Sequence, residues 1–413
     1  MGSCQGSGSG RKEGEVNKGF PDPNMREVSP GRELRPEEIA AAMDGVLRPH
    51  KTEPDRIEAF LPSPCVQNHA ANLAFLADGS LACVWFGGTM EGMGDVSIWM
   101  SRLLAGAGRW GQAVRLTDDP ERSEQNPILF QAPDGRVRLF HTSQPGGRQE
   151  ECEIRYRTSL DGGASFGPSE RLGDFRGIFV RQLLHIGPGG EWLLPGFRCV
   201  ALPDRRWTGA QDTAVMLVSA DRGATWRAHE VPESLGAVHM NPVKDGSGPM
   251  IAFYRNRFAT SVLRSLSQDG GLTWSKPEPT PLPSNNSSIQ AIRRRDGRIA
   301  MVLNPVNAAM SSERRASLYD EVEGDDGPSG PGGAIWGVPR APLSLVLSAD
   351  DGASFPERRD LETGSGYCLT NNSANGLNRE YSYPSILEGP DGSLHIAYTY
   401  HRRAIKYVCL RWD

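Results

Sequence analysis

The sequence predicts a six-bladed β-propeller, an all-β fold, and two periodic motifs carry this prediction. The first motif is Ser-x-Asp-x-Gly-x-(Ser/Thr)-(Trp/Phe), with copies that begin at Ser159, Ser219, Ser267 and Ser348. In each copy the Asp carboxylate can accept hydrogen bonds from nearby backbone N–H groups and from the small hydroxyl residue. The Gly supplies a backbone conformation that other residues rarely adopt. Four copies of one pattern indicate a repeat architecture.

Turn dipeptides form the second motif. Asp-Gly or Gly-Gly pairs flanked by apolar alternation begin at residues 78, 134, 189, 245, 296 and 391, and all but the last interval are roughly 55 residues long. Such pairs are strong hairpin signals. Six units of this length each have room for four strands, as in a propeller blade. The sixth unit ends early, so we expect a strand at residues 56–61 to complete its blade and close the ring.

Two segments are predicted to lie outside the regular blades. Residues 1–50 are expected to form a flexible extension, because the first 30 are rich in Gly, Ser and charged residues. A short helix is expected near residues 35–46, where Pro36 and two glutamates suit a first helical turn. The propeller is expected to span residues 56–413. A polar, Gly/Pro-rich stretch at about residues 305–340 predicts an exposed insertion.

Composition narrows the partners and the compartment. The formal net charge of −5 gives no reason to expect binding to nucleic acid or to an anionic membrane. Seven cysteines without metal-ligand spacing predict reduced thiols, and no residues call for a metal or cofactor. No apolar run predicts a signal peptide or a transmembrane segment. We therefore expect a cytoplasmic protein. The start MGSCQG offers Gly2 and Cys4 for acylation, although Gly6 stands where the acylation pattern has Ser or Thr.

Polar residues recur where each innermost strand is predicted to begin. The segment before each turn dipeptide is expected to be this innermost strand, so its first residues surround the axis of the ring. These positions carry Gln67-Asn68-His69, Gln125-Asn126, Arg181-Gln182, Met240-Asn241, Asn286-Ser287-Ser288 and Tyr381-Ser382-Tyr383. Hydrogen-bonding groups at equivalent positions of six blades suit a hydroxyl-rich ligand better than they suit core packing. Asn68, Asn126 and Asn241 are therefore candidates for substrate binding.

Arginines are predicted to reach the same face of the ring from blades three, four and six. They are Arg181, Arg198, Arg255 (with Arg257 nearby), and Arg402 or Arg403. The planar guanidinium suits fork-shaped recognition of a carboxylate. The alternative is ordinary surface arginine, because the chain is rich in this residue.

A few carboxylates and tyrosines are candidates for acid–base or nucleophilic chemistry. Glu91 and Asp95 lie in a Gly-rich loop, where a general acid could act. Glu380 is adjacent to Tyr381 and close to Tyr383, and a tyrosine next to a carboxylate could be activated as a nucleophile. The alternative for Glu380 is a solvated loop residue.

Longer segments of the chain resemble a known family. The four Asp motifs, WFGGTMEG with DVSIWMSR, RSLSQDGGLTWSKPEPTPLP and the ending EYSYPSILEGPDGSLHIAYTYHRRAIKY resemble sialidase-like proteins built from BNR (Asp-box) repeats. The resemblance covers roughly residues 56–413. It implies an exo-acting glycoside hydrolase that removes a terminal acidic sugar from a glycan. Sialidases hold the sugar carboxylate with three arginines, use a Tyr–Glu pair as nucleophile and base, and protonate the leaving group with an Asp.

The resemblance implies roles for particular residues of this chain. The arginine clamp would fall to Arg181 or Arg198, Arg255 and Arg402. The nucleophile would be Tyr383 or Tyr381, and the acid would be Asp95 or Glu91. One departure concerns the Phe/Tyr-Arg-Ile-Pro motif, which carries the first arginine of sialidases and is absent here. Residues Val66-Gln67-Asn68-His69 hold the nearest place.

Two alternatives to a sialidase-type enzyme remain open at the level of sequence. One is another carbohydrate-active enzyme, either a different exo-glycosidase or a lyase that cleaves uronic-acid polymers, with His69 and Tyr383 moving protons. For a lone histidine such as His69, a structural hydrogen-bonded role is the alternative. The other is a non-catalytic propeller that binds glycan or protein, because propellers host many functions. Three guanidinium groups around one small volume and facing a tyrosine would favour the sialidase type.

Overall fold

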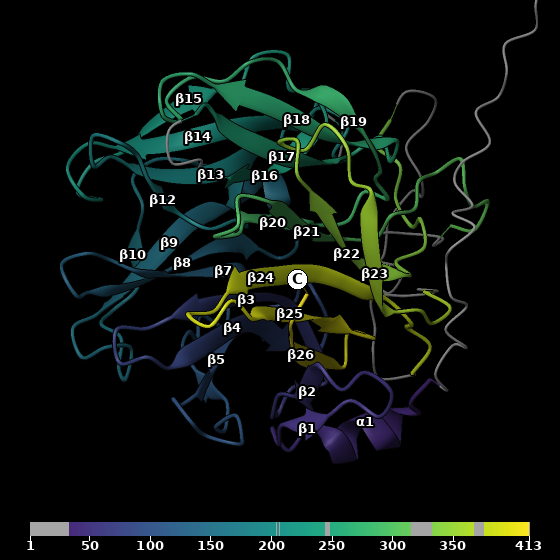
Figure 1. The fold of residues 1–413 in the computed structure, drawn as a ribbon. Coiled ribbons are helices and arrows are strands. Elements are labelled where there is room, and N and C mark those ends of the chain that lie inside the picture. Colours follow the sequence, from purple (N-terminus) through teal and green to yellow (C-terminus); the bar gives the residue numbers. More distant parts are fainter. Residues whose placement is uncertain are drawn as a thin grey trace, which may run out of the picture. The chain divides into compact units, whose positions relative to one another are not determined.

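The computed structural model describes residues 33–203, 205, 207–243, 248–314, 333–366 and 376–412. The expected flexible start with Gly2 and Cys4, the Asp245-Gly246 turn and much of the expected insertion lie outside these residues. Within them the strands form six antiparallel sheets that follow one another along the chain (Figure 1). The protein is therefore a six-bladed β-propeller, as predicted. The division of the chain at residue 50 stays a prediction.

The strands of each blade are numbered from the axis of the ring outward. Blade one contains β3 (Gln67–Phe75), β4 (Leu81–Gly88), β5 (Ser97–Leu103) and β6 (Val114–Arg115). Blade two contains β7 (Arg122–Gln131), β8 (Val137–Pro145), β9 (Glu153–Ser159) and β10 (Glu170–Arg171), with the 3-10 helix η1 (Gln149–Glu151) after β8. Blade three contains β11 (Ile178–Val180) and β12 (His185–Ile186), which share the inner position, then β13 (Trp192–Arg198), β14 (Thr213–Ser219) and β15 (Arg227–Glu230).

The last three blades continue the same pattern. Blade four contains β16 (Ala237–Val243), β17 (Met250–Asn256), β18 (Ser261–Ser267) and β19 (Glu278–Pro283). Blade five contains β20 (Gln290–Arg293), β21 (Ile299–Leu303), β22 (Leu343–Ser348) and β23 (Glu357–Glu362). Blade six contains β24 (Tyr381–Glu388), β25 (Leu394–Tyr400) and β26 (Ala404–Leu410), followed by β2 (Arg56–Phe60) and β1 (Arg48–Pro49) from the N-terminal side.

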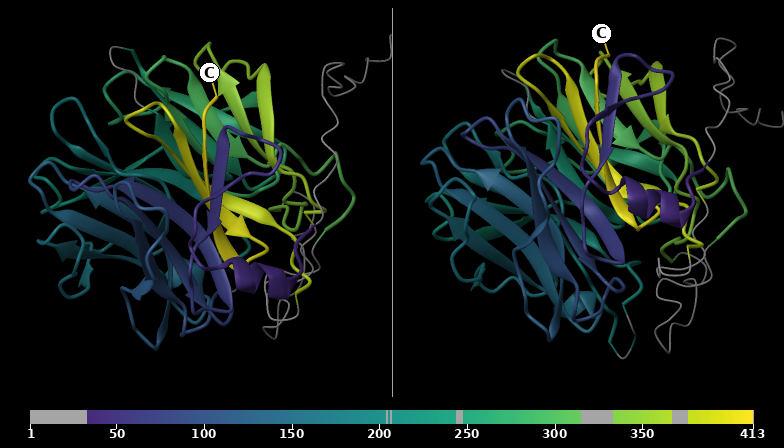
Figure 2. Two further views of the ribbon diagram at one scale, coloured as in Figure 1. Left: turned by 60° about the horizontal axis from the view of Figure 1, so that its bottom comes forward. Right: turned by 90° about the horizontal axis from the view of Figure 1, so that it is seen from below.

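An N-terminal strand closes the ring, as the sequence predicted. β2 pairs with β26 from Arg56 opposite Leu410 to Phe60 opposite Lys406. Figure 2 shows these early strands, in purple, beside the yellow last blade. This pairing covers the edge that β26 would otherwise leave open, and it joins residues from the two ends of the described chain. The predicted helix is α1 (Pro36–Ala42), which buries Ile39.

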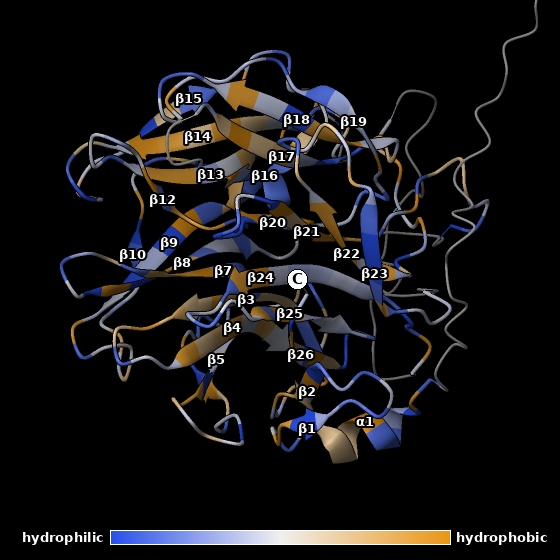
Figure 3. Cartoon of the chain, in the orientation of Figure 1, coloured by the Kyte–Doolittle hydropathy of each residue, from blue (hydrophilic) through white to orange (hydrophobic). Residues whose placement is uncertain are grey.

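Apolar side chains fill the space between neighbouring blades. Strand interiors are mostly hydrophobic and the connecting loops are mostly hydrophilic (Figure 3). Val84 of blade one and Leu139 of blade two, for example, are fully buried members of one cluster. None of the helices in the described ranges has the length and apolar character needed to cross a bilayer.

The four Asp motifs lie at the turns between the third and fourth strands of blades two to five. In the copy at Asp269, one carboxylate oxygen accepts hydrogen bonds from the Ser267 hydroxyl at 2.8 Å and the Thr273 N–H at 2.9 Å. The other oxygen accepts the Thr273 hydroxyl at 2.6 Å. The indole of Trp274 is nearly buried and donates to the carbonyl oxygen of Gly271. These motifs fix the outer turns of the blades, far along the chain from the inner-strand heads.

Four inner strands share a β-bulge close to their first residue. The pairing register shifts between His69 and Asn72, Gln125 and Ile128, Val238 and Asn241, and Ser382 and Ser385. The first extra residue of each bulge has a left-handed backbone, with φ of 60° at Ala70 and 51° at Asn126, His239 and Tyr383. A bulge breaks the alternation of a strand and redirects the side chain at that position. Asn126, His239 and Tyr383 owe their positions to it.

We predict that replacing Asp269 with alanine destabilises the propeller without changing its ligand site. The variant loses the hydrogen bonds that organise one outer turn, so we expect the free energy of unfolding to fall by about 1 kcal/mol. Urea unfolding measures this change. The control is Asp118→Ala, a substitution at an exposed aspartate outside the motif. Equal stability of the two variants would contradict the structural role of the Asp motif.

Candidate functional site

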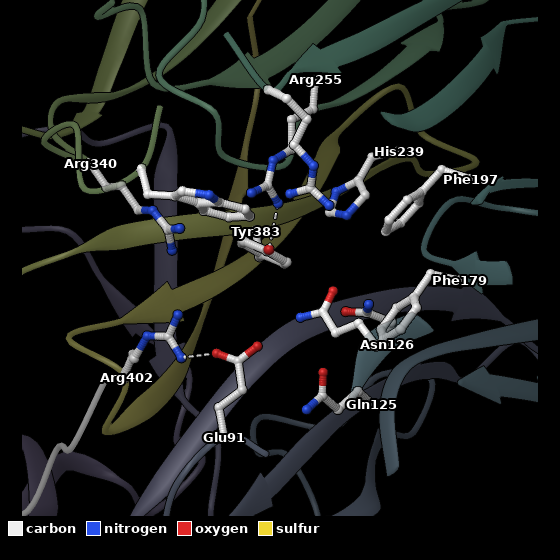
Figure 4. Close-up of a pocket in the computed structure, with 13 residues that line it drawn as sticks. Glu91, Gln125, Asn126, Phe179, Phe197, His239, Arg255, Arg340, Tyr383 and Arg402 are labelled. Carbon is white, nitrogen blue, oxygen red and sulfur yellow. Dashed lines mark hydrogen bonds and ion pairs between the residues drawn. The ribbon is translucent and has the colours of Figure 1, made fainter. Parts of the chain in front are cut away.

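A pocket of about 440 Å³ lies where the heads of the inner strands meet (Figure 4). Every blade contributes to its lining, which consists of Glu91, Gln125, Asn126, Gln149, Phe179, Phe197, His239, Arg255, Arg257, Trp336, Arg340, Tyr383 and Arg402. Figure 4 shows Arg340 and Arg402 on one side of Tyr383, and Phe179, Phe197 and the amides of Gln125 and Asn126 on the other. The pocket therefore offers cationic, amide and aromatic surfaces to a small ligand.

Tyr383 is surrounded by positive charge. The guanidinium carbons of Arg181, Arg255 and Arg340 lie 5.5, 5.7 and 5.5 Å from the centre of its ring. Nη1 of Arg255 donates a hydrogen bond to the Tyr383 hydroxyl oxygen at 2.6 Å. Burial by itself would raise the pKa of Tyr383, but the charges of Arg255 and Arg340 outweigh it and lower this pKa below its usual value. The site therefore favours the phenolate.

Arg255 has a donor left over for a ligand. Its Nε donates to Oδ1 of Asn286 at 2.7 Å, whereas its buried Nη2 has no hydrogen-bond partner among the described residues. Burial lowers the pKa of Arg255 to about 9, so the group still carries its charge at neutral pH. A buried charged donor without an acceptor is costly, and an anionic oxygen would satisfy it.

Glu380 holds two of the other arginines in place. Arg340 donates to both of its carboxylate oxygens at 3.1 Å, and Nε of Arg402 donates at 2.8 Å. Glu380 is fully buried and does not line the pocket. Nη1 of Arg402 also pairs with Glu91, at 2.6 Å, which ties the Gly-rich loop after β4 to blade six. Glu380 thus fixes the arginines rather than standing as a solvated loop residue.

Arg257 is held from all sides. It pairs with the buried Asp212 at 2.7 Å, and its guanidinium lies 4.7 Å from the ring centre of Trp336 and 5.3 Å from that of Phe197. Cation–π contacts at these distances stabilise a desolvated guanidinium. Because its charge is balanced by Asp212, we regard Arg257 as part of the pocket wall.

His239 lies beside Tyr383. The two ring centres are 5.6 Å apart with the planes at 77°, and Nδ1 of His239 has no hydrogen-bond partner in the described structure. Burial, and then the charges of Arg255 and Arg257, hold the pKa of His239 well below its usual value. The imidazole is therefore neutral at pH 7 and able to accept a proton.

Five of the residues expected at the site line the pocket. They are Tyr383, Glu91, Arg255, Arg402 and Asn126. Eight others do not line it: Tyr381, Glu380, Asp95, His69, Arg181, Arg198, Asn68 and Asn241. Tyr381 is almost fully buried, and burial raises its pKa, so its phenolate is disfavoured. His69 packs against the Tyr383 ring at 4.2 Å and shares a hydrogen bond with the Thr399 hydroxyl.

The remaining residues outside the pocket have structural partners. Asn68 donates to the carbonyl oxygens of Cys65 and Arg403, and Asn241 joins two blades through both backbone polar groups of Ala291. Arg198 pairs with the exposed Glu230 at 2.6 Å. Asp95 is exposed and accepts hydrogen bonds from the backbone and hydroxyl of Thr89. The contacts of Arg181 are described below.

Sequence reasoning missed three lining residues. His239 precedes the predicted head Met240-Asn241, and only the bulge turns it inward; the shared position of His239 and Tyr383, each two residues before a buried polar residue, was the available signal. Trp336 and Arg340 belong to the stretch that was expected to be an exposed insertion. That expectation was wrong for its last residues, because Ala334, Val338 and Arg340 are buried. The apolar run AIWGV was a sign of this return to the core.

Comparison with known proteins places the chain among repeat propellers. The family model described as BNR repeat-like domain matches residues 79–396. The Hadza microbial sialidase Hz136 superposes with a TM-score of 0.63 at 12% identity, over 84% of this chain and 66% of that one. A Dyadobacter fermentans protein of unknown function gives a TM-score of 0.63 at 15% identity, over 88% and 99%. The Ruminococcus gnavus intramolecular trans-sialidase gives 0.60 at 12% identity, over 84% and 94%. No match was found among curated protein sequences.

We predict that His239 contributes to the pH dependence of stability. Because its folded pKa lies below the unfolded value near 6.5, the unfolded chain binds an extra proton as pH falls below 6.5, and stability declines. Between pH 7.5 and 5.5 this loss is about 1.4 kcal/mol for one fully buried histidine. Urea unfolding at both pH values should show a His239→Gln difference smaller than that of wild type by this amount. The exposed His229→Gln variant should match wild type, and an unchanged difference in His239→Gln would refute the neutral, buried state of His239.

Proposed function

The chain belongs to the family of BNR repeat-like domains, and we propose that it is an exo-acting glycoside hydrolase of sialidase type. Its substrate would be a terminal acidic sugar of a glycan. One observation carries the proposal, namely a tyrosine enclosed by guanidinium groups in a pocket of about 440 Å³. The fold shared with sialidases is consistent with it.

The charges of the pocket support binding of a carboxylate. Four arginines line it, and the carboxylates of Glu380, Glu91 and Asp212 pair with three of them, Arg340, Arg402 and Arg257. Arg255 has no carboxylate partner among the residues described, and its Nη2 is free to donate. A substrate carboxylate would supply the missing anion. The amides of Gln125 and Asn126 on the opposite wall suit sugar hydroxyl groups.

The proposed chemistry proceeds through Tyr383. Its phenolate oxygen attacks the anomeric carbon while the glycosidic C–O bond breaks, and Glu91 gives a proton to the departing oxygen. His239 accepts the phenol proton before the attack. Water then displaces the tyrosine from the anomeric carbon and passes its proton to Glu91, which restores the starting state. Arg255 stabilises the phenolate at both ends of this cycle, because it donates to the Tyr383 oxygen.

A second candidate is a lyase that acts on a uronic acid by β-elimination. The neutral His239 beside Tyr383 favours it, because this reaction needs a base and an acid near a carbon whose carboxylate is neutralised. Arg255 would bind that carboxylate. The two reactions differ in their products, since elimination leaves a carbon–carbon double bond that absorbs ultraviolet light and hydrolysis does not.

We expect Tyr383→Phe to abolish sugar release. The substitution removes the reacting oxygen and little else, so kcat/KM should fall on the order of 10³-fold or more. Arg255→Ala should cost about 10²-fold or more, because it removes the charge that stabilises the phenolate. Release is measured against a panel of terminal acidic and neutral sugars. Tyr381→Phe is the matched control, and full activity of Tyr383→Phe or failure to release any sugar would disprove the hydrolase proposal.

The general acid is tested by Glu91→Gln. Hydrolysis of a natural glycoside should fall about 10²- to 10⁴-fold, because its leaving group needs a proton. Hydrolysis of a nitrophenyl glycoside should fall much less, since nitrophenolate leaves without one. Asp95→Asn, at the other acid considered from the sequence, should keep both activities. Equal losses on both substrates in Glu91→Gln would exclude Glu91 as the acid.

A further inference from the structure

The inner edge of blade three departs from the pattern of the other blades. β11 ends at Val180, which pairs with Gly196, and β12 begins at His185, which pairs with Leu193. Residues 181–184 therefore stand opposite only Leu194 and Pro195. This wider interruption takes Arg181 out of the sheet, so its side chain extends toward other blades instead of lying in the pleat.

Arg181 joins the bulges of blades one and six. Its Nη2 donates to the carbonyl oxygen of Ala71 at 3.0 Å and to those of Tyr383 and Pro384, both at 3.1 Å. These three carbonyls belong to the extra residues of the two bulges, which lack regular ladder partners. The side chain is almost fully buried, so the protein itself must satisfy these groups. One guanidinium thus fixes the backbone on both sides of Tyr383.

Arg181 also places a positive charge under the Tyr383 ring. The guanidinium carbon lies 5.5 Å from the ring centre. Burial lowers the pKa of Arg181 to about 10, so it remains charged at neutral pH, and Tyr383 is first among the groups that favour this charge. Nε and Nη1 have no hydrogen-bond partner in the described ranges. With no carboxylate beside it, this charge is available to stabilise a Tyr383 phenolate.

We propose that Arg181 is a positioning residue for Tyr383, which it holds in the bulge from another blade and whose ionised form it stabilises from beneath the ring. The inference rests on the proposed role of Tyr383 as nucleophile and deepens it. It replaces the sequence-based expectation that Arg181 clamps a substrate carboxylate, because Arg181 does not line the pocket. A purely structural brace would hold the backbone without affecting the ionisation of the phenol.

Ultraviolet titration of tyrosine ionisation separates these two roles and needs no substrate. The signal of Tyr383 is the difference between a variant and the same variant carrying Tyr383→Phe. In Arg181→Met, we expect the pKa of Tyr383 to rise on the order of one unit or more, because a nearby cation is lost. Arg181→Lys retains the charge and should restore most of the wild-type value. Arg198→Met, in the same blade but paired with Glu230 at the surface, is the matched control and should leave the titration unchanged.

Kinetics provide the second measurement. Arg181→Met should lower kcat with little change in KM, since Arg181 does not touch the substrate, and Arg181→Lys should recover part of the loss. A folded Arg181→Met protein that titrates like wild type would overturn the inference. If that variant does not fold, Arg181→Gln, which retains a donor for the carbonyls but no charge, decides in the same way. A wild-type protein that releases no sugar would defeat the proposed function, whereas the titration would still judge the role of Arg181.

Discussion

The bulge at the head of the inner strands is the constraint on which the site depends. In a regular strand, successive side chains alternate between faces, and none is forced to point along the axis of the ring. The extra residue breaks this alternation at Asn126, His239 and Tyr383, each with a φ of 51°. A left-handed conformation costs a non-glycine residue about 1–2 kcal/mol. The pocket thus rests on backbone strain that the packed blades around it must sustain.

The arrangement of charge follows from the same geometry. Arg340 and Arg402 are oriented by the buried Glu380, and Arg257 is oriented by Asp212. These pairs hold guanidinium groups at fixed places with little net charge. Arg255 and Arg181 have no such carboxylate, and both approach Tyr383, one at its hydroxyl and one beneath its ring. The positive potential is therefore concentrated on one phenol, where it favours an oxyanion nucleophile.

The fold was predictable from sequence because its signals are local and repeated. The Asp motif at Ser267 and the turn at Asp296-Gly297 each report on a few consecutive residues, and their spacing sets the number of blades. The site was predictable only in part. Tyr383, Arg255 and Glu91 were identified from their places along predicted strands and loops, whereas His239 depends on a register shift that residue patterns do not display. Arg340 depends on a long segment that folds back against blade six, and the role of Arg181 depends on contacts among three blades.

The most direct test of the account is to trap a sugar on Tyr383. An acidic glycoside with a good leaving group, and with fluorine next to the anomeric carbon to slow the second displacement, should accumulate a covalent intermediate. Peptide mapping by mass spectrometry should then place the added sugar on Tyr383 in the wild-type protein and show no adduct in Tyr383→Phe. Turnover of the parent sugar without an adduct on Tyr383, an adduct on another residue, or an unsaturated product would contradict a tyrosine nucleophile.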